Sequence, residues 1–168
     1  MPLSMYQTSV PVFLHGFANL SAILDKGLAF ADEQGVDPDA LVQARLIEDM
    51  GPLSSQVQRA SDTAKGCAAR LAGIDMPSFE DNEATFPELQ DRISRTVAFL
   101  QTVRPEQIDG SEERDVLLTA GKQSFAFRGQ EFLLQHALPN FFFHVTTAYD
   151  ILRHKGVPVG KRDYLGRR

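Results

Sequence analysis

The side chains with the clearest potential for chemistry lie in one segment near the C-terminus, residues 130–155. An α-helix over this segment brings Asn140 and His144 onto one face, because residues four apart are neighbours on a helix surface. His136 and His154 project to the flanks of that face. A carboxamide and an imidazole on one buried face are able to hydrogen-bond a substrate, and an imidazole is also a metal ligand.

The burial of His144 is predicted from the distribution of polar residues around this helix. At about 100° per residue, His144 projects nearly opposite to the polar side, and Asn140 lies beside it one turn earlier. The residues on the polar side are Glu131, Gln135, Thr146 and Arg153. Since buried polar groups normally have hydrogen-bond partners, one interpretation is a satisfied His–Asn pair in the core.

The other interpretation is a polar pocket that includes residues of an earlier helix. His144 and Asn140 would meet Asp49 or Gln56 there and form a substrate site, or a weakened metal site in which His144 acts with His136 or Asp49. Both earlier residues also have structural explanations, because Asp49 is placed to cap a helix and Gln56 projects only to the edge of an apolar stripe. The two interpretations remain open at this point.

Two further reactive groups have structural explanations. Cys67 projects near the inner face of its helix, where a thiol packs as an apolar group, and no histidine close in sequence would activate it as a nucleophile. Asp62 and Lys65 project outward on the same helix, three residues apart, so we expect them to form a solvated ion pair.

Four long helices are expected to position these groups. The first covers about residues 5–33, with Pro11 near its beginning, and its apolar residues recur at steps of three and four. A short helix follows Asp37 and Pro38. The second long helix starts after Gly51 and Pro52 with Asp49 as its cap. The apolar stripe of the first helix is Phe13, Phe17, Leu20, Leu24 and Leu28.

The second half of the chain contains the remaining elements. Gly73 ends the second helix, and Thr85 with Glu88 has the spacing of a capping box at the start of the third, which Pro105 closes. Two short strands around Ala120-Gly121-Lys122 form a predicted β-hairpin before the fourth helix. The expected fold is therefore mainly α, an up-and-down four-helix bundle with a small β-hairpin before the last helix.

Length and composition fit one domain over residues 1–168. The chain has 43% hydrophobic residues and 12 Phe, which supply enough apolar surface for one continuous core. A net charge of -5 provides no general attraction to nucleic acid. We see no signal peptide and no stretch of membrane-spanning length, and with a single cysteine we expect a cytoplasmic protein that has no membrane partner.

The order of elements, together with DMGPLSSQVQ and ALPNFFFHVTTAYDILRHKGVPVGKRDYLG, resembles a bacterial family of unknown function within the DinB/YfiT-like superfamily of metalloenzymes. The resemblance covers essentially the whole chain. It implies a four-helix bundle whose nickel or zinc ion is held by one histidine from the second helix and a His-x-x-x-His pair on the fourth.

The sequence departs from this metal-binding pattern at two places. His144 matches the second histidine of the pair, but Asn140 stands at the first, and a carboxamide is a poor ligand for such metals. No histidine lies between His15 and His136, so the second-helix ligand is missing. We therefore expect no resident cofactor, with a nickel or zinc centre as the alternative.

Three functions of different classes follow. The first is small-molecule binding in a bundle pocket whose superfamily metal site is degenerate. The second is a divalent-metal-dependent hydrolase or thiol transferase, and the third is a structural, dimer-forming protein without catalysis. A homodimer is expected because Phe142 and Tyr149 project together near the polar edge of the last helix, although the hairpin or Tyr164 would cover them equally well.

Overall fold

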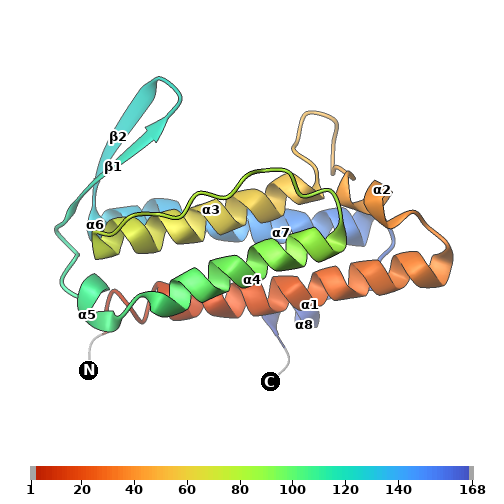
Figure 1. Cartoon of the computed structure of the whole chain (residues 1–168), viewed down its shortest axis with the longest axis horizontal. Helices are drawn as coiled ribbons and strands as arrows, with labels where there is room; N and C mark the ends of the chain where they lie inside the picture. The colour runs from red at the N-terminus through yellow and green to blue at the C-terminus, as the bar shows by residue number, and fades with distance from the viewer. Residues whose placement is uncertain (1–2, 167–168) are drawn as a thin grey trace.

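Four long helices build most of the computed structural model, which describes residues 3–166. α1 and α4 lie side by side, as do α3 and α7, and further contacts between α3 and α4 and between α1 and α7 close the bundle (Figure 1). The predicted mainly α four-helix bundle is confirmed. The long helices are α1 (Val10–Gln34), α3 (Leu53–Ala72), α4 (Phe86–Thr102) and a last helix in three consecutive parts, α6 (Gly129–Glu131), η1 (Phe132–Ala137) and α7 (Leu138–His154).

The connectivity differs from the up-and-down order expected from the sequence, because α3 and α4 run in the same direction (Figure 1). The short helix α2 (Pro38–Val42) contacts both of them, and α5 (Pro105–Ile108), which follows α4, contacts α3. The chain must therefore return along the bundle between the two helices. Figure 1 shows the connection, residues 73–85, running back along α3 before α4 begins.

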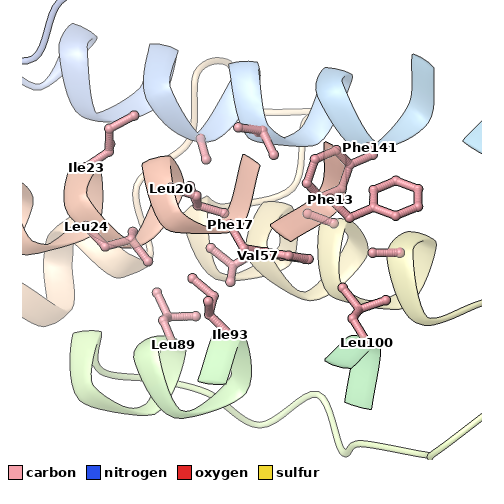
Figure 2. Close-up of a cluster of buried hydrophobic side chains, with 14 of the residues drawn as sticks. Phe13, Phe17, Leu20, Ile23, Leu24, Val57, Leu89, Ile93, Leu100 and Phe141 are labelled. Carbon is pink, nitrogen blue, oxygen red and sulfur yellow. The ribbon is translucent and has the colours of Figure 1, made fainter. Parts of the chain in front are cut away.

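The core lies between the four helices and is built from their apolar stripes. Phe13 and Phe17 of α1 meet the ring of Phe141 of α7 edge-on, with centroids 5.0 and 5.1 Å apart. Figure 2 shows these rings beside leucine and isoleucine side chains of α1 and α4. The three consecutive phenylalanines diverge as a helix requires, since Phe141 is fully buried, Phe142 is partly buried and Phe143 is 55% exposed.

Local signals explain most helix boundaries. The capping box of α4 is confirmed, since Glu88 N–H donates to Thr85 Oγ1 at 3.4 Å and Thr85 N–H donates to Glu88 Oε2 at 2.9 Å. The first helix begins at Val10 instead of near residue 5, because Pro11 lacks an N–H and fits best in a first turn. The predicted cap at Asp49 is wrong. Pro52 precedes α3 directly and Asp49 lies exposed in the turn before it.

The last helix contains a π-helical segment immediately before its proline. Leu138 N–H donates to the carbonyl of Leu133, five residues back, instead of four. Pro139 has no N–H to offer, and its ring crowds the carbonyl four residues earlier, so the wider turn relieves an α-helical conflict. The segment also presents Phe132 and His136 with nearly parallel rings, whose centroids are 5.7 Å apart.

The predicted β-hairpin is confirmed. β1 (Asp115–Ala120) pairs antiparallel with β2 (Gln123–Arg128), and Gly121 adopts a φ of 60° in the two-residue turn, where glycine carries no steric penalty. The hairpin projects from one end of the bundle (Figure 1). Phe127 anchors it through contact with Phe132 at 5.9 Å between ring centroids.

The C-terminal helix α8 (Lys161–Leu165) packs against α1. The ring of Tyr164 lies 6.1 Å from that of Tyr149, and its hydroxyl accepts a hydrogen bond from Thr146 at 2.9 Å. Tyr164 thus covers Tyr149 within the chain. Among residues 3–166, no helix is long and apolar enough to cross a membrane.

A buried arginine holds the connection against α3 and α4. The Arg92 side chain is fully buried and makes ion pairs with Glu83 at 3.0 Å, Asp62 at 3.0 Å and Asp81 at 2.9 Å. Gln58 donates a further hydrogen bond to Glu83 at 2.9 Å. Burial alone would raise the pKa of Glu83, but the hydrogen bonds from Gln58 and Arg92 outweigh it and lower that pKa.

The prediction that Lys65 and Asp62 form a solvated ion pair is wrong for Lys65, which is buried. Its ion pair with Asp62 exists at 3.0 Å, but the Lys65 side chain is only 1% exposed. The connection covers this side of α3, so Lys65 Nζ donates to the Pro77 carbonyl at 3.1 Å and lies 3.6 Å from the centre of the Phe79 ring. Burial lowers the pKa of Lys65, although the Asp62 carboxylate opposes that shift.

We expect Arg92→Leu to lower the free energy of unfolding by about 3 kcal/mol, because it leaves Glu83 buried without its cationic partner. Gln101→Leu is the control on the same helix. The Gln101 side chain is exposed and takes no part in the ion pairs of Arg92, so its replacement should cost less than about 0.5 kcal/mol. Guanidinium chloride unfolding measures both, and equal losses in the two variants would contradict the role given to Arg92.

Candidate functional site

His144 and Gln56 form a polar pair between α7 and α3. His144 is 6% exposed and Gln56 is 2% exposed, and the distance between His144 Nδ1 and Gln56 Oε1 is 2.8 Å. The Gln56 amide donates through Nε2 to the Gly51 carbonyl at 2.9 Å, so its oxygen is left to accept. Nδ1 of His144 therefore carries the proton, and Nε2 has the lone pair.

The environment of His144 favours a neutral imidazole. Burial lowers the pKa of His144 to about 4, and the nearby positive charge of Arg59 contributes to the shift. The same charge would repel a metal cation at Nε2. This arrangement supports the first of the two interpretations for His144, a hydrogen-bonded group of the core, with Gln56 as its partner instead of Asn140.

Asn140 forms a second polar pair between the same helices, one turn from His144. Its Nδ2 donates to Thr63 Oγ1 at 2.7 Å, and Thr63 in turn donates to the Arg59 carbonyl at 2.7 Å. Asn140 is only partly buried. It stands at the edge of a cavity, whereas His144 lies within the packed bundle.

The cavity is a pocket of about 300 Å³ at the end of the bundle from which the hairpin projects. Four elements supply its walls: the C-terminal half of α3, the connection, β1, and the last helix around its π segment. Pockets of this size bind small molecules. The lining residues are Asp62, Thr63, Lys65, Arg70, Met76, Pro77, Ser78, Phe79, Leu118, Phe132, His136, Ala137 and Asn140.

The pocket combines apolar walls with polar groups that lack protein partners. Phe132, Phe79 and Leu118 supply apolar surface. Within residues 3–166, the His136 imidazole makes ring contacts with Phe127 and Phe132 but no hydrogen bond. Such an arrangement suits a ligand with an apolar body and one or two polar groups.

The structure brings together some of the predicted site residues. Asn140 and His136 line the pocket, and His144 meets Gln56 in the packed bundle, outside the pocket lining. Asp49 is exposed before α3 and takes no part. Thr63 and the wall from the connection are absent from the sequence-based site, because Thr63 carries no spacing signal and the connection has no periodic pattern that would place it over α3.

The donor set does not fit the three-histidine metal site that the sequence resemblance implies. Asn140 stands at the position of the first histidine and donates through Nδ2 to Thr63 Oγ1, and His144 is paired with the Gln56 carboxamide, which is a poor ligand for such metals. No group of three or more His, Cys, Asp or Glu side chains within residues 3–166 is arranged to hold a metal ion. Cys67 is fully buried, and its burial raises the pKa of the thiol, as expected for a packing residue.

The fold is that of a DinB-like helical protein. A crystal structure of a DinB family member protein from Shewanella denitrificans is similar to this chain at 41% sequence identity, with a TM-score of 0.89, and the match covers 97% of this chain and 92% of that one. The sequence matches the family described as "Domain of unknown function (DUF1993)" over residues 5–165, and the chain belongs to this family. Comparison with curated proteins gives no match.

We expect His144→Phe to lower the free energy of unfolding by about 1–3 kcal/mol at pH 8, because Gln56 loses its partner in the core. The wild-type protein should also lose stability as pH falls from about 6.5 toward 4. Over that range the unfolded chain binds a proton at His144 and the folded chain does not, which amounts to about 3 kcal/mol at most for one group. The variant should lack this contribution.

His154→Phe is the matched control, since His154 is exposed on the same helix. Urea unfolding at several pH values measures all three proteins. An unchanged midpoint, slope and pH dependence in His144→Phe would show that His144 is not the buried neutral group described above.

Proposed function

We propose that this protein binds a small molecule in the pocket between α3, the connection, β1 and the last helix, and that the superfamily metal site is degenerate in it. The observation that carries the proposal is the pocket itself, about 300 Å³ lined by Asn140, His136 and apolar side chains. We further expect the protein to act in the cytoplasm, on the ground of its single cysteine.

The pairing of α3 with α7 supports the degenerate metal site. At the turns where a metal would join the two helices, two neutral hydrogen bonds join them, from Asn140 to Thr63 and between His144 and Gln56. These bonds satisfy buried polar groups without an ion. The pocket lies beside them and remains open to a ligand.

Small aromatic and aliphatic fragments titrated into ¹⁵N-labelled protein should shift the amide resonances of the pocket in a saturable way. Ser78→Trp places a large ring in the pocket and should abolish these shifts. Ser94→Trp, on an exposed face of α4, is the matched control and should leave them unchanged. If no fragment perturbs the pocket, or if Ser78→Trp binds as wild type does, the proposed binding site is wrong.

Protein purified without a histidine tag should contain far less than one equivalent of nickel, zinc or iron, because Asn140 and the histidine-free α3 offer too few ligands. Elemental analysis by mass spectrometry measures the equivalents of each metal per protein chain. Stoichiometric metal that disappears in His144→Ala would contradict this expectation and favour the alternative function, a metal-dependent hydrolase or thiol transferase.

Homodimerisation is the other proposal, and it accords with a structural function as well as with a binding one. Its support lies in apolar surface on the last helix, where Phe143 is 55% exposed and Phe142 is partly buried. Contact with Tyr164 removes Tyr149 from that surface. Sedimentation equilibrium at micromolar concentration tests the proposal, and a monomer would refute it.

A further inference from the structure

We propose that the ligand of this pocket is a small organic carboxylate, and that the Arg70 guanidinium is its anchor. The inference rests on the proposed function, because it names the chemical class of molecule for the same pocket. Three observations carry it: the position of Arg70, the absence of an anionic partner for it, and the pairing of every other charged group in the pocket lining.

Arg70 lies folded back along α3 toward the pocket. Its Nη1 occupies the space above Gly66, where a Cβ atom would collide with the guanidinium. The guanidinium carbon also lies 6.0 Å from the centre of the Phe132 ring, on the opposite wall. Gly66, one turn earlier, leaves room for this cation, and the Phe132 ring lies near it at the pocket surface.

Arg70 has no protein anion to neutralise it. Across residues 3–166, its guanidinium makes no ion pair and no hydrogen bond, although it is partly buried. Guanidinium groups match carboxylates through two parallel N–H···O bonds, and that capacity is unused at Arg70. A partly buried guanidinium with unused donors at the wall of a pocket points to an anionic ligand.

The other charges of the lining cancel one another. Asp62 is the one carboxylate among the lining residues, and its Oδ1 is shared by Lys65 at 3.0 Å and Arg92 at 3.0 Å. Lys65 is engaged with Asp62, the Pro77 carbonyl and the Phe79 ring. The lining thus contains two cations, Lys65 and Arg70, against one carboxylate, in a chain whose net charge is -5.

The rest of the pocket favours an organic acid over a bare inorganic anion. Phe132 and His136 stack across one wall, and Met76 and Leu118 add apolar surface. A ring or short alkyl chain would bury this surface, while the carboxylate reached Arg70. The imidazole of His136 and the Oδ1 oxygen of Asn140, whose Nδ2 is bonded to Thr63, remain available for a second polar group on the ligand.

Benzoate and benzamide separate charge from shape, because the two molecules are nearly isosteric and only benzoate is anionic at pH 7.5. We expect benzoate to bind at least about tenfold more tightly than benzamide when pocket amide shifts are titrated. Arg70→Gln should remove that preference and leave benzamide binding unchanged. Arg104→Gln, at an exposed arginine before α5, is the control and should behave as wild type does.

The outcomes distinguish this inference from the proposed function. If benzamide and other neutral fragments bind as tightly as benzoate, or if Arg70→Gln retains the benzoate preference, the carboxylate inference is wrong and the pocket remains a binding site. If inorganic phosphate displaces benzoate at lower concentrations than benzoate itself needs, a phosphate ligand replaces the organic acid. If no probe of any charge perturbs the pocket, both the inference and the proposed function fail.

Discussion

The ion pairs of the buried Arg92 side chain are the interaction on which the rest of the structure depends. Because α3 and α4 run in the same direction, the chain has to travel back along the bundle through residues 73–85, a segment without regular secondary structure. Such a segment has no backbone ladder to order it. Arg92 supplies the order by joining Glu83 and Asp81 of the connection to Asp62 of α3.

The same network shapes the pocket. Phe79 stacks near three cations, with Lys65 at 3.6 Å and Arg95 at 4.4 Å the nearest, and this holds the neighbouring residues 76–78 against α3 as a pocket wall. The Asp62 carboxylate forms ion pairs with Lys65 and Arg92, so its charge is not available to Arg70. The connection therefore shapes the pocket, and the pairing of Asp62 with Lys65 and Arg92 leaves Arg70 as the unpaired charge among the lining residues that the structure describes.

Sequence reasoning predicts those parts of the fold that depend on local rules. The stripe from Phe13 to Leu24, the capping box at Thr85 and the Gly121 turn each follow from periodicity or backbone sterics, and the structure confirms them. Asp49 and Lys65 are misplaced for a common reason. The first comes from the position of Asp49 before Gly51 and Pro52 and the second from projecting α3 alone, and the chain that precedes or covers that helix decides whether a side chain caps it, is exposed or is buried.

The candidate site likewise has residues that the sequence predicts and residues that it does not. The burial of His144 follows from the helical projection of residues 130–155, whereas that projection offers Asn140 as its partner, and Gln56 is one of two residues that the pocket interpretation takes from the earlier segment. No sequence motif predicts the role proposed for Arg70. That role depends on the space above Gly66 and on the ion pairs of Asp62 with Lys65 and Arg92. A charge without a partner is a property of the folded chain and is not visible in the sequence.

The π segment of the last helix connects the packed bundle with the pocket. Pro139 widens the turn before it, and the widened turn supplies Phe132 and His136 to the pocket. Beyond Pro139 the helix is regular, and its neutral hydrogen bonds to α3 involve Asn140 and His144. There His144 is hydrogen-bonded within the core, and Nδ2 of Asn140 has Thr63 as its partner. In the π segment before the proline, His136 faces the pocket without a hydrogen-bond partner among residues 3–166, and there a ligand has a partner to gain.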